Sequence, residues 1–484
     1  MPHRSLQIPE LVYEIATKLL PPCDVGHYGD SRFPEIKNGR KDVLSLALTS
    51  KAFLEQSLDI LWRDLDSMYP ILHVLDVIPT RDIWPGHRGS SASRVYRSVN
   101  AMKELGLLAE AHWDRLDYYG PRIRSLLVTQ YHPPVYRTLL RYRQKTSGFA
   151  VTPNLRSLIW RVHDEEHFGF LPFCGPSLTS LTIKPPNLDI STLELAVKST
   201  SHHLSPEAFV HIATMPHLET LTLTTLPPEW FPPISPGNPA STPFLPAVKN
   251  LRLSHSRLDT IARFLPAIDN VRQLERIQIE FAEEDQKTTI GSFIATVGKF
   301  CSVALVAFFL SLKRIHPDIE DRSIDVFRFT QAIFSPLLAF KNMEQCDIRV
   351  HVLDVDDAFL ESVAASWPNL RSFSLIPIEK YKDESRLTLP GLLPLAKNCP
   401  HLYNVKLNLN TRITADDLSA GLDRMVRTWD HAAVVGTLPD LHLWLGGLRS
   451  LARGRQSEVA EHLKAIFPNT RSISDATIEY SMDR

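Results

Sequence analysis

The stretch Pro153–Trp160, with the sequence PNLRSLIW, contains the frame that decides the fold: Pro-x-Leu-x-x-Leu-x-Leu. Its last two apolar residues stand two positions apart, which is the spacing of side chains on one face of a β-strand. The proline ends whatever element comes before it. The frame therefore predicts a short strand with one face in a core.

This frame recurs along most of the chain. Six further clear copies are PRIRSLLV (121–128), PSLTSLTI (176–183), PHLETLTL (216–223), PAVKNLRL (246–253), PNLRSFSL (368–375) and PHLYNVKL (400–407). Degenerate copies are VRQLERIQI (271–279), NMEQCDI (342–348) and PNTRSISD (468–475). Helix-like stretches lie between copies, among them LDTIARFLPAI (258–268), DAFLESVAA (357–365) and LPGLLPLAK (389–397). A repeated strand and helix predicts an α/β solenoid, in which each unit covers its neighbour's open apolar face. The alternative is a non-repetitive α/β domain whose strands share a Pro-x-Leu start.

The first 65 residues carry helical patterns instead. The segment LQIPELVYEIATKLL (6–20) predicts a helix with two adjacent apolar stripes, Leu11/Ile15/Leu19 and Val12/Ala16/Leu20. The polar segment 21–41 is interpreted as a loop. The block 42–65, DVLSLALTSKAFLEQSLDILWRDL, then predicts two further short helices and a third apolar face, with Asp42 and Ser50 as N-caps. Such short helices cannot bury this apolar surface among themselves, so they either dock on the rest of the chain or bind a partner.

Composition excludes several classes of protein. A net charge of −1 argues against a general nucleic-acid or membrane-surface binder. The five cysteines form no CxxC pair, which favours reduced thiols in a cytoplasmic or nuclear protein. No signal peptide is recognisable. The most apolar run, 303–312 (VALVAFFLSL), is too short to span a bilayer and predicts a buried strand.

No catalytic set is evident, so we expect a non-enzyme without cofactor or metal. In HDEEH (163–167), His163 and His167 stand four apart, but Asp164 occupies the position where a zinc-protease helix needs Glu. Asp354, Asp356 and Asp357 lack the glycine and the final glutamate of a calcium loop. A solvated charged loop explains the histidines, and a hydrolase remains a remote alternative.

The N-terminal block resembles an F-box. The ordered matches are Ile8-Pro9-Glu10-Leu11, then Ile15 and Leu19, Asp42-Val43, Leu46 to Lys51, Phe53 and finally Leu61-Trp62. The sequence departs from the family pattern at Thr49, where valine is usual, and in its longer connecting loop. The resemblance implies docking on a Skp-family adaptor and, through it, on a cullin–RING ubiquitin ligase. The adaptor-binding residues that it implies are Ile8, Pro9, Leu11, Ile15, Leu19, Leu46, Leu48, Phe53 and Trp62.

The repeats that follow resemble divergent leucine-rich repeats of fungal-type F-box proteins. The expected fold is therefore α/β: an N-terminal three-helix F-box followed by an irregular leucine-rich-repeat solenoid. The expected domains are an F-box-like domain (1–65), a helical connector (66–120) that includes a helix at 105–116, and the repeat domain (121–484). The resemblance implies the substrate-recognition subunit of an SCF-type ligase. The alternative is a repeat scaffold without ligase function, whose N-terminal helices serve only as a cap.

Strand geometry assigns a face for binding an unknown protein target, because residues that flank the buried pair point away from the core. The candidates are Arg161, Lys184, Thr222, Arg252, Gln278, Arg349, Lys406 and Asn408. A proline-rich segment, 227–246, is interpreted as a surface loop whose aromatic residues pack locally. The alternative is a clamp over the binding face.

Overall fold

The computed structural model describes most of the chain between residues 8 and 474. The described residues are 8–21, 33–75, 113–129, 139, 150–161, 169–183, 206–224, 226, 244–254, 256–282, 287–313, 328–377, 385–410, 441–446, 467 and 470–474. The chain divides into two compact units, 1–224 with 239–247, and 225–238 with 248–484.

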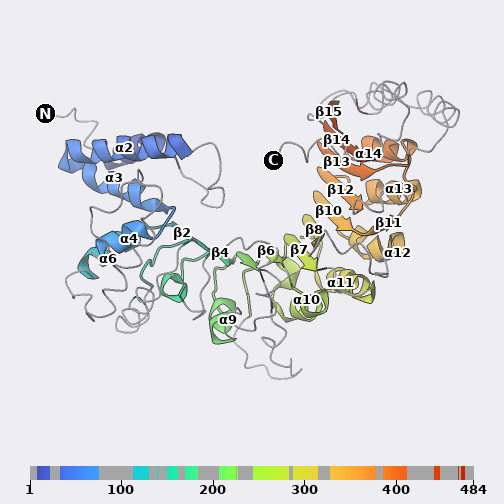
Figure 1. The fold of residues 1–484 in the computed structure, drawn as a ribbon, viewed down its shortest axis with the longest axis horizontal. Helices are drawn as coiled ribbons and strands as arrows, with labels where there is room; N and C mark the ends of the chain where they lie inside the picture. The colour runs from blue at the N-terminus through green and yellow to red at the C-terminus, as the bar shows by residue number, and fades with distance from the viewer. Residues whose placement is uncertain are drawn as a thin grey trace, which may run out of the picture. The chain divides into compact units, whose positions relative to one another are not determined.

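The first unit opens with helices (Figure 1) and continues as a parallel sheet with the strand order β1-β2-β3-β4-β5. Its helices are α1 (Pro9–Leu19), α2 (Phe33–Thr49), α3 (Lys51–Arg63), α4 (Tyr69–Val74), α6 (Trp113–Tyr119) and α9 (Pro206–Ala213), with 3₁₀ turns η5 (Gly120–Arg122) and η6 (Leu171–Phe173). Its strands are β1 (Asp64–Leu65), β2 (Ser125–Val128), β3 (Ser157–Trp160), β4 (Ser180–Ile183) and β5 (Thr220–Leu223).

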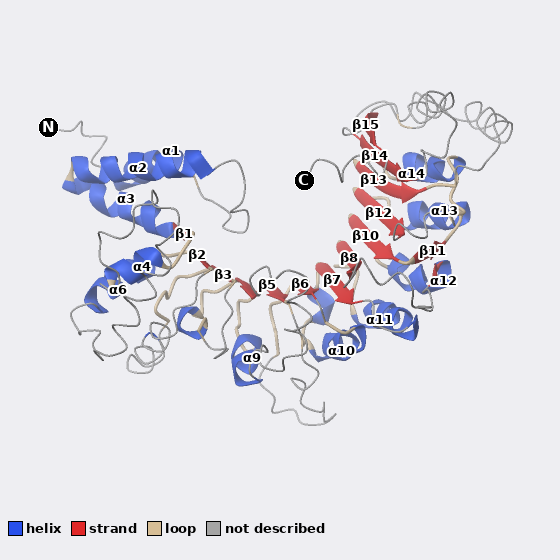
Figure 2. Cartoon of the chain, in the orientation of Figure 1, coloured by secondary structure: helices blue, strands red, loops and turns tan. Residues whose placement is uncertain are grey.

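The second unit repeats strand and helix with strand order β6-β7-β8-β10-β12-β13-β14-β15. Its main strands are β6 (Asn250–Ser254), β7 (Arg276–Ala282), β8 (Ala307–Lys313), β10 (Gln345–Val350), β12 (Ser372–Pro377), β13 (Asn404–Asn408), β14 (Leu441–Gly446) and β15 (Thr470–Ser474). Its helices are α10 (Leu258–Phe264), α11 (Lys287–Phe300), α12 (Gln331–Phe334), α13 (Asp357–Ser366) and α14 (Leu393–Asn398). Short 3₁₀ turns are η8 (Leu265–Ala267), η9 (Val271–Gln273), η10 (Ser335–Ala339) and η12 (Pro390–Leu392), and β9 (Arg328–Thr330) pairs with β11 (Val352–Asp354) in a small second sheet. Figure 2 shows α10, α11, α13 and α14 along one side of the main sheet.

The repeated frame forms strands at every predicted copy, so the repeat prediction is confirmed at the level of strand-plus-helix units. Its fifth residue begins each strand, and its sixth lies on the core side. These sixth residues are aligned by strand register and are 0–1% exposed: Leu126, Leu158, Leu181 and Leu221 in the first unit, and Leu251, Phe373 and Val405 in the second. Consecutive strands are parallel because the chain crosses back on one side of the sheet between them.

The proline of the frame has a more specific role than ending an element. In five repeats the N–H two residues after the proline donates to the carbonyl just before it: Ile123 to Gly120 (3.2 Å), Leu155 to Thr152 (3.1 Å), Leu178 to Gly175 (3.2 Å), Leu370 to Trp367 (3.1 Å) and Leu402 to Cys399 (3.2 Å). The proline thus occupies the second position of a β-turn, where its fixed φ is favourable.

Among the described repeats, eight neighbouring pairs are joined by the same two backbone hydrogen bonds. The carbonyl of Arg124 accepts from the N–H groups of Arg156 (2.8 Å) and Ser157 (3.0 Å). In the second unit the carbonyl of Lys249 accepts from Glu275 (2.8 Å) and Arg276 (3.1 Å). The stacking of repeats therefore satisfies backbone groups that the strand ladder would leave open.

The N-terminal helices differ from the predicted boundaries. Helix α2 begins at Phe33, so the predicted loop over 21–41 is wrong for its last nine residues, and Asp42 lies inside the helix instead of capping it. Gly39 suggested a loop, but here it permits close packing: a Cβ at this position would lie 2.4 Å from the carbonyl oxygen of Leu19. Ser50 does cap α3, since its hydroxyl accepts from the N–H of Ala52 at 3.2 Å.

Helix α3 runs without a break from Lys51 to Arg63, so the two further helices predicted from the block 42–65 are α2 and α3. Leu65 belongs to β1, which pairs with β2 and thus begins the sheet inside the predicted helical domain. The predicted domain boundaries at 65 and 120 stay predictions. The apolar run 303–312 forms most of β8, as expected. No helix among the described residues is long and apolar enough to cross a membrane.

Candidate functional site

Helix α1 buries only one of its two apolar stripes. Val12, Ala16 and Leu20 are 2%, 0% and 7% exposed, and Ala16 and Leu20 pack in one core cluster with Val43 of α2 and Ile60 of α3. The neighbouring stripe remains on the surface. Its members and their exposed fractions are Ile8 46%, Leu11 43%, Ile15 41% and Leu19 39%, and we call these four residues the α1 stripe.

Helix α2 exposes two further leucines one turn apart. Leu44 is 49% and Leu48 77% exposed, whereas Val43 and Ala47 beside them are buried. Leu48 was among the predicted adaptor-binding residues and Leu44 was not. The four-residue spacing of the two leucines is the signal that could have added Leu44.

Three of the predicted adaptor-binding residues are packing residues in this chain. Leu46 is half-buried against the helical core cluster, and Phe53 is 8% exposed. The Trp62 ring stacks on Tyr119, with 4.5 Å between ring centroids. All three side chains contribute to the packing of the helices that carry the exposed stripe, and of the three only Phe53 is buried. The adaptor-binding role of all nine predicted residues stays a prediction.

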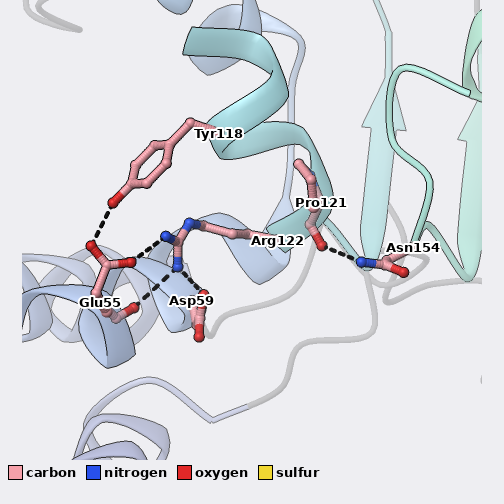
Figure 3. Close-up of polar contacts among 6 residues, drawn as sticks. All are labelled: Glu55, Asp59, Tyr118, Pro121, Arg122 and Asn154. Atoms are coloured by element: carbon pink, nitrogen blue, oxygen red, sulfur yellow. Dashed lines mark hydrogen bonds and ion pairs between the residues drawn. The ribbon is translucent and has the colours of Figure 1, made fainter. Parts of the chain in front are cut away.

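Arg122 attaches α3 to the segment that leads into β2 (Figure 3). Its guanidinium donates to the carboxylates of Glu55 and Asp59, and it lies 4.7 Å from the centroid of the Tyr118 ring. The Tyr118 hydroxyl donates to Glu55 at 2.6 Å. The hydrogen bond from Tyr118, followed by that from Arg122, lowers the pKa of Glu55, and the same Tyr118–Glu55 bond raises the pKa of Tyr118.

The same segment continues into the first repeats. The Asn154 side-chain amide donates to the carbonyl of Pro121 at 2.8 Å, as Figure 3 also shows. Asn342 makes the equivalent bond to the carbonyl of Val303 at 2.9 Å. Asparagine therefore joins successive turns at two repeats, and in both it stands three residues before the strand begins.

The sheet face opposite the buried rows has no described helix over it; we call it the open face. In the first unit, Asp64 of β1, the register partner of Ser125, is charged, whereas the open-face residues of β2 to β5 carry no charge. They are Ser125, Leu127, Ser157, Ile159, Ser180, Thr182, Thr220 and Thr222. Leu127 and Ile159 form a small buried cluster within it. This part of the open face is made of hydroxyl and aliphatic groups.

In the second unit the open face is polar and charged. The middle residues of its strands are aligned by register and are Arg252, Gln278, Phe309, Asp347, Ser374 and Lys406. Arg252 and Glu280 form an ion pair of 2.9 Å across neighbouring strands, and Gln278 lies 3.4 Å from the same carboxylate. Arg349 pairs with Asp347 at 3.3 Å.

The predicted target-binding residues are not equally accessible. Arg161, Arg252, Gln278, Arg349 and Lys406 are half-buried or exposed. Thr222 is only 7% and Asn408 2% exposed, because a short side chain in a parallel sheet is shielded by its neighbours on both adjacent strands. Lys184 lies outside the described residues, and the role of every one of these residues stays a prediction.

The other candidates from the sequence have structural roles or fall outside the described part. The Asp356 carboxylate caps α13, Asp357 accepts from the N–H of Thr388 at 2.8 Å, and Asp354 pairs with Arg386 at 2.6 Å. Among described residues, no group of three or more metal-binding side chains converges. His163 and His167 lie outside the described residues.

Most of the proline-rich segment, including Trp230 and Phe231, is likewise outside the described residues. Phe244, at its end, contacts Phe209 of α9 edge-on, with 5.7 Å between ring centroids. Local packing of its aromatic residues is therefore observed for Phe244.

Comparison with known proteins gives little further information. No family model matches the chain, and no curated protein matches it. Among solved structures it is similar to one titled "Crystal structure of Rad7 and Elc1 complex in yeast", at 17% identity and a TM-score of 0.36, over 72% of this chain and 79% of that chain. A TM-score of this size is too low to identify the fold or the function of this chain.

Proposed function

We propose that this protein is the substrate-recognition subunit of an SCF-type ubiquitin ligase. The α1 stripe, with Leu44 and Leu48 of α2, binds a Skp-family adaptor, and the open face of the repeats binds a target protein. The chain supplies no catalytic side chain in this proposal. It accelerates ubiquitin transfer by holding the target near the ligase, which is a proximity effect.

One observation carries the proposal: α1 exposes a complete apolar stripe although its other stripe is well packed. Scattered surface leucines need no explanation, but four apolar residues in consecutive turns of one helix form a continuous strip. An amphipathic helix with such a strip is suited to a helix-in-groove contact. The same residues resemble an F-box in their order, and this resemblance is the reason for proposing a Skp-family adaptor.

A second observation favours the scaffold alternative. The Arg122 hydrogen bonds, the Trp62–Tyr119 stack and the β1–β2 pairing attach the helices to the sheet, as expected of an end cap. A cap and a docking module are compatible on one set of helices. The exposed α1 stripe is the feature that a cap does not require.

The test is co-purification of the full chain with a Skp-family adaptor. Wild type should elute as a one-to-one complex, and Leu11→Asp/Ile15→Asp should elute alone, because two charges would enter the apolar contact. Both side chains are more than 40% exposed, so the variant should unfold at the wild-type temperature.

Val303→Asp is the matched control. It places a charge on another exposed apolar residue, 57% accessible, outside the helices. This variant should still bind the adaptor. A wild-type chain that ignores the adaptor would remove the ligase proposal and leave the scaffold.

A further inference from the structure

Charges on the open face of the second unit do not cancel. The strand side chains described on this face include four cations and two anions: Arg252, Arg276, Arg349, Lys406, Glu280 and Asp347. Both anions are already paired, Glu280 with Arg252 at 2.9 Å and Asp347 with Arg349 at 3.3 Å. Arg276 and Lys406 therefore have no carboxylate among the described strand residues of this face.

Among the described residues, those directly before the strands do not change this excess. Lys249 and Glu275 have opposite charges, and Arg371 pairs with Glu344 at 3.3 Å. His442, exposed on β14 at the edge of the same face, adds no negative charge. The described side chains of the open face in the second unit thus carry an excess of two positive charges.

The first of these cations lies on an aromatic ring. The Arg276 guanidinium is 5.6 Å from the centroid of Phe309, which lies two residues along β8 from Ala307, the register partner of Arg276. A guanidinium held on a ring loses less conformational freedom when it binds an anion. Lys406, half-buried on β13, has no ion pair with another described residue.

We infer that this face binds an extended acidic polypeptide segment that runs across the strands. Arg276 on β7 and Lys406 on β13 are separated by β8, β10 and β12. Four steps of strand spacing amount to about 19 Å, which an extended chain spans in about six residues. The segment should therefore carry acidic groups about six positions apart. The inference rests on the proposed function in one respect only: the acidic segment is taken to belong to a target protein of the ligase.

The test is fluorescence anisotropy with a labelled synthetic peptide and the full chain. The peptide is built of Ser, Thr and Val, with two Glu residues about six positions apart, and its counterpart has Gln in their place. We expect binding of the Glu peptide, weakened by salt, and no binding of the Gln peptide. Arg276→Gln and Lys406→Gln should each weaken binding about fivefold, and the double variant about 25-fold.

The matched controls remove the same charges from the helix side of the unit. Arg263→Gln on α10 and Lys397→Gln on α14 are both exposed and should leave binding at the wild-type level. Circular-dichroism melting of every variant separates lost binding from lost folding. Absence of peptide binding, or equal losses in the controls, would overturn the inference.

Adaptor co-purification of Arg276→Gln/Lys406→Gln separates this inference from the proposed function. The double variant should still bind the adaptor, because its changes lie in the second unit and the α1 stripe in the first. If the wild type binds the acidic peptide but not the adaptor, the ligase proposal fails and the acidic-segment site stands. If it binds the adaptor but not the peptide, the reverse holds.

Discussion

At the scale of single residues, the carboxylate of Glu55 makes the attachment of the helices to the repeats dependent on pH. Its carboxylate accepts from Tyr118 and Arg122, and these bonds lower its pKa from the ordinary value of 4.5. Because the folded-state pKa lies below the unfolded one, the bonds stabilise the fold above about pH 4.5. That stabilisation is lost as the pH falls through the folded-state pKa.

We therefore expect the free energy of unfolding of the wild type to fall more steeply from about pH 5 to about pH 3 than that of Glu55→Gln. Urea denaturation followed by circular dichroism at each pH measures both. Glu361→Gln, which changes an exposed carboxylate on α13, should keep the wild-type slope. Identical slopes for the wild type and Glu55→Gln would show that the Glu55 contacts contribute nothing in solution.

At the scale of elements, the contact between α1 and α2 depends on Gly39. An added Cβ would lie 2.4 Å from the backbone oxygen of Leu19, and a backbone atom cannot move aside as a flexible side chain could. Alanine favours a helix over glycine by about 1 kcal/mol, so propensity alone predicts stabilisation. We expect the steric clash to outweigh the gain in helix propensity, because α1 would have to move as a whole to relieve it.

Gly39→Ala should lower the free energy of unfolding by about 1–3 kcal/mol. It should also weaken adaptor binding, since Leu19 belongs to the α1 stripe. Gly291→Ala in α11 is the control, because its nearest atom, Cγ1 of Ile333, is 3.9 Å away. That change should raise the free energy of unfolding by about 0.5–1 kcal/mol. A stabilised Gly39→Ala would mean that α1 is not held against α2 in solution.

At the scale of the whole molecule, the two compact units should unfold separately. Buried cysteines provide reporters for both: Cys174 in the first unit, and Cys301, Cys346 and Cys399 in the second. Burial raises the pKa of Cys301 and Cys399 to about 12, so these thiols should resist alkylation in the native state.

Pulsed alkylation along a urea gradient, read by mass spectrometry, measures when each thiol becomes accessible. Cys301, Cys346 and Cys399 should become labelled together, at a urea concentration different from that for Cys174. Denaturation in concentrated urea gives the reference for complete labelling. One common midpoint for all four would indicate a single cooperative unit.

The sequence by itself determined the repeat unit. A two-residue apolar period after a turn predicts a strand, and this local rule held even for the degenerate copies, of which 271–279 and 342–348 lack the proline. The frame did not predict β14. There Leu441, Leu443 and Leu445 alternate after Pro439, but the two-residue gap between the first and second leucines of the frame is missing. Strand alternation also determined which residues share the open face, Arg252 and Lys406 among them.

Only the tertiary structure decided which apolar surfaces are covered. By helical periodicity alone, either apolar stripe of α1 could be the buried one, Leu11/Ile15/Leu19 or Val12/Ala16/Leu20. The second stripe is the buried one because Val43 and Ile60, which lie far along the chain, pack on it. Local spacing fixes which residues share a face. Burial depends on distant partners, so helical periodicity alone could not show which stripe is exposed.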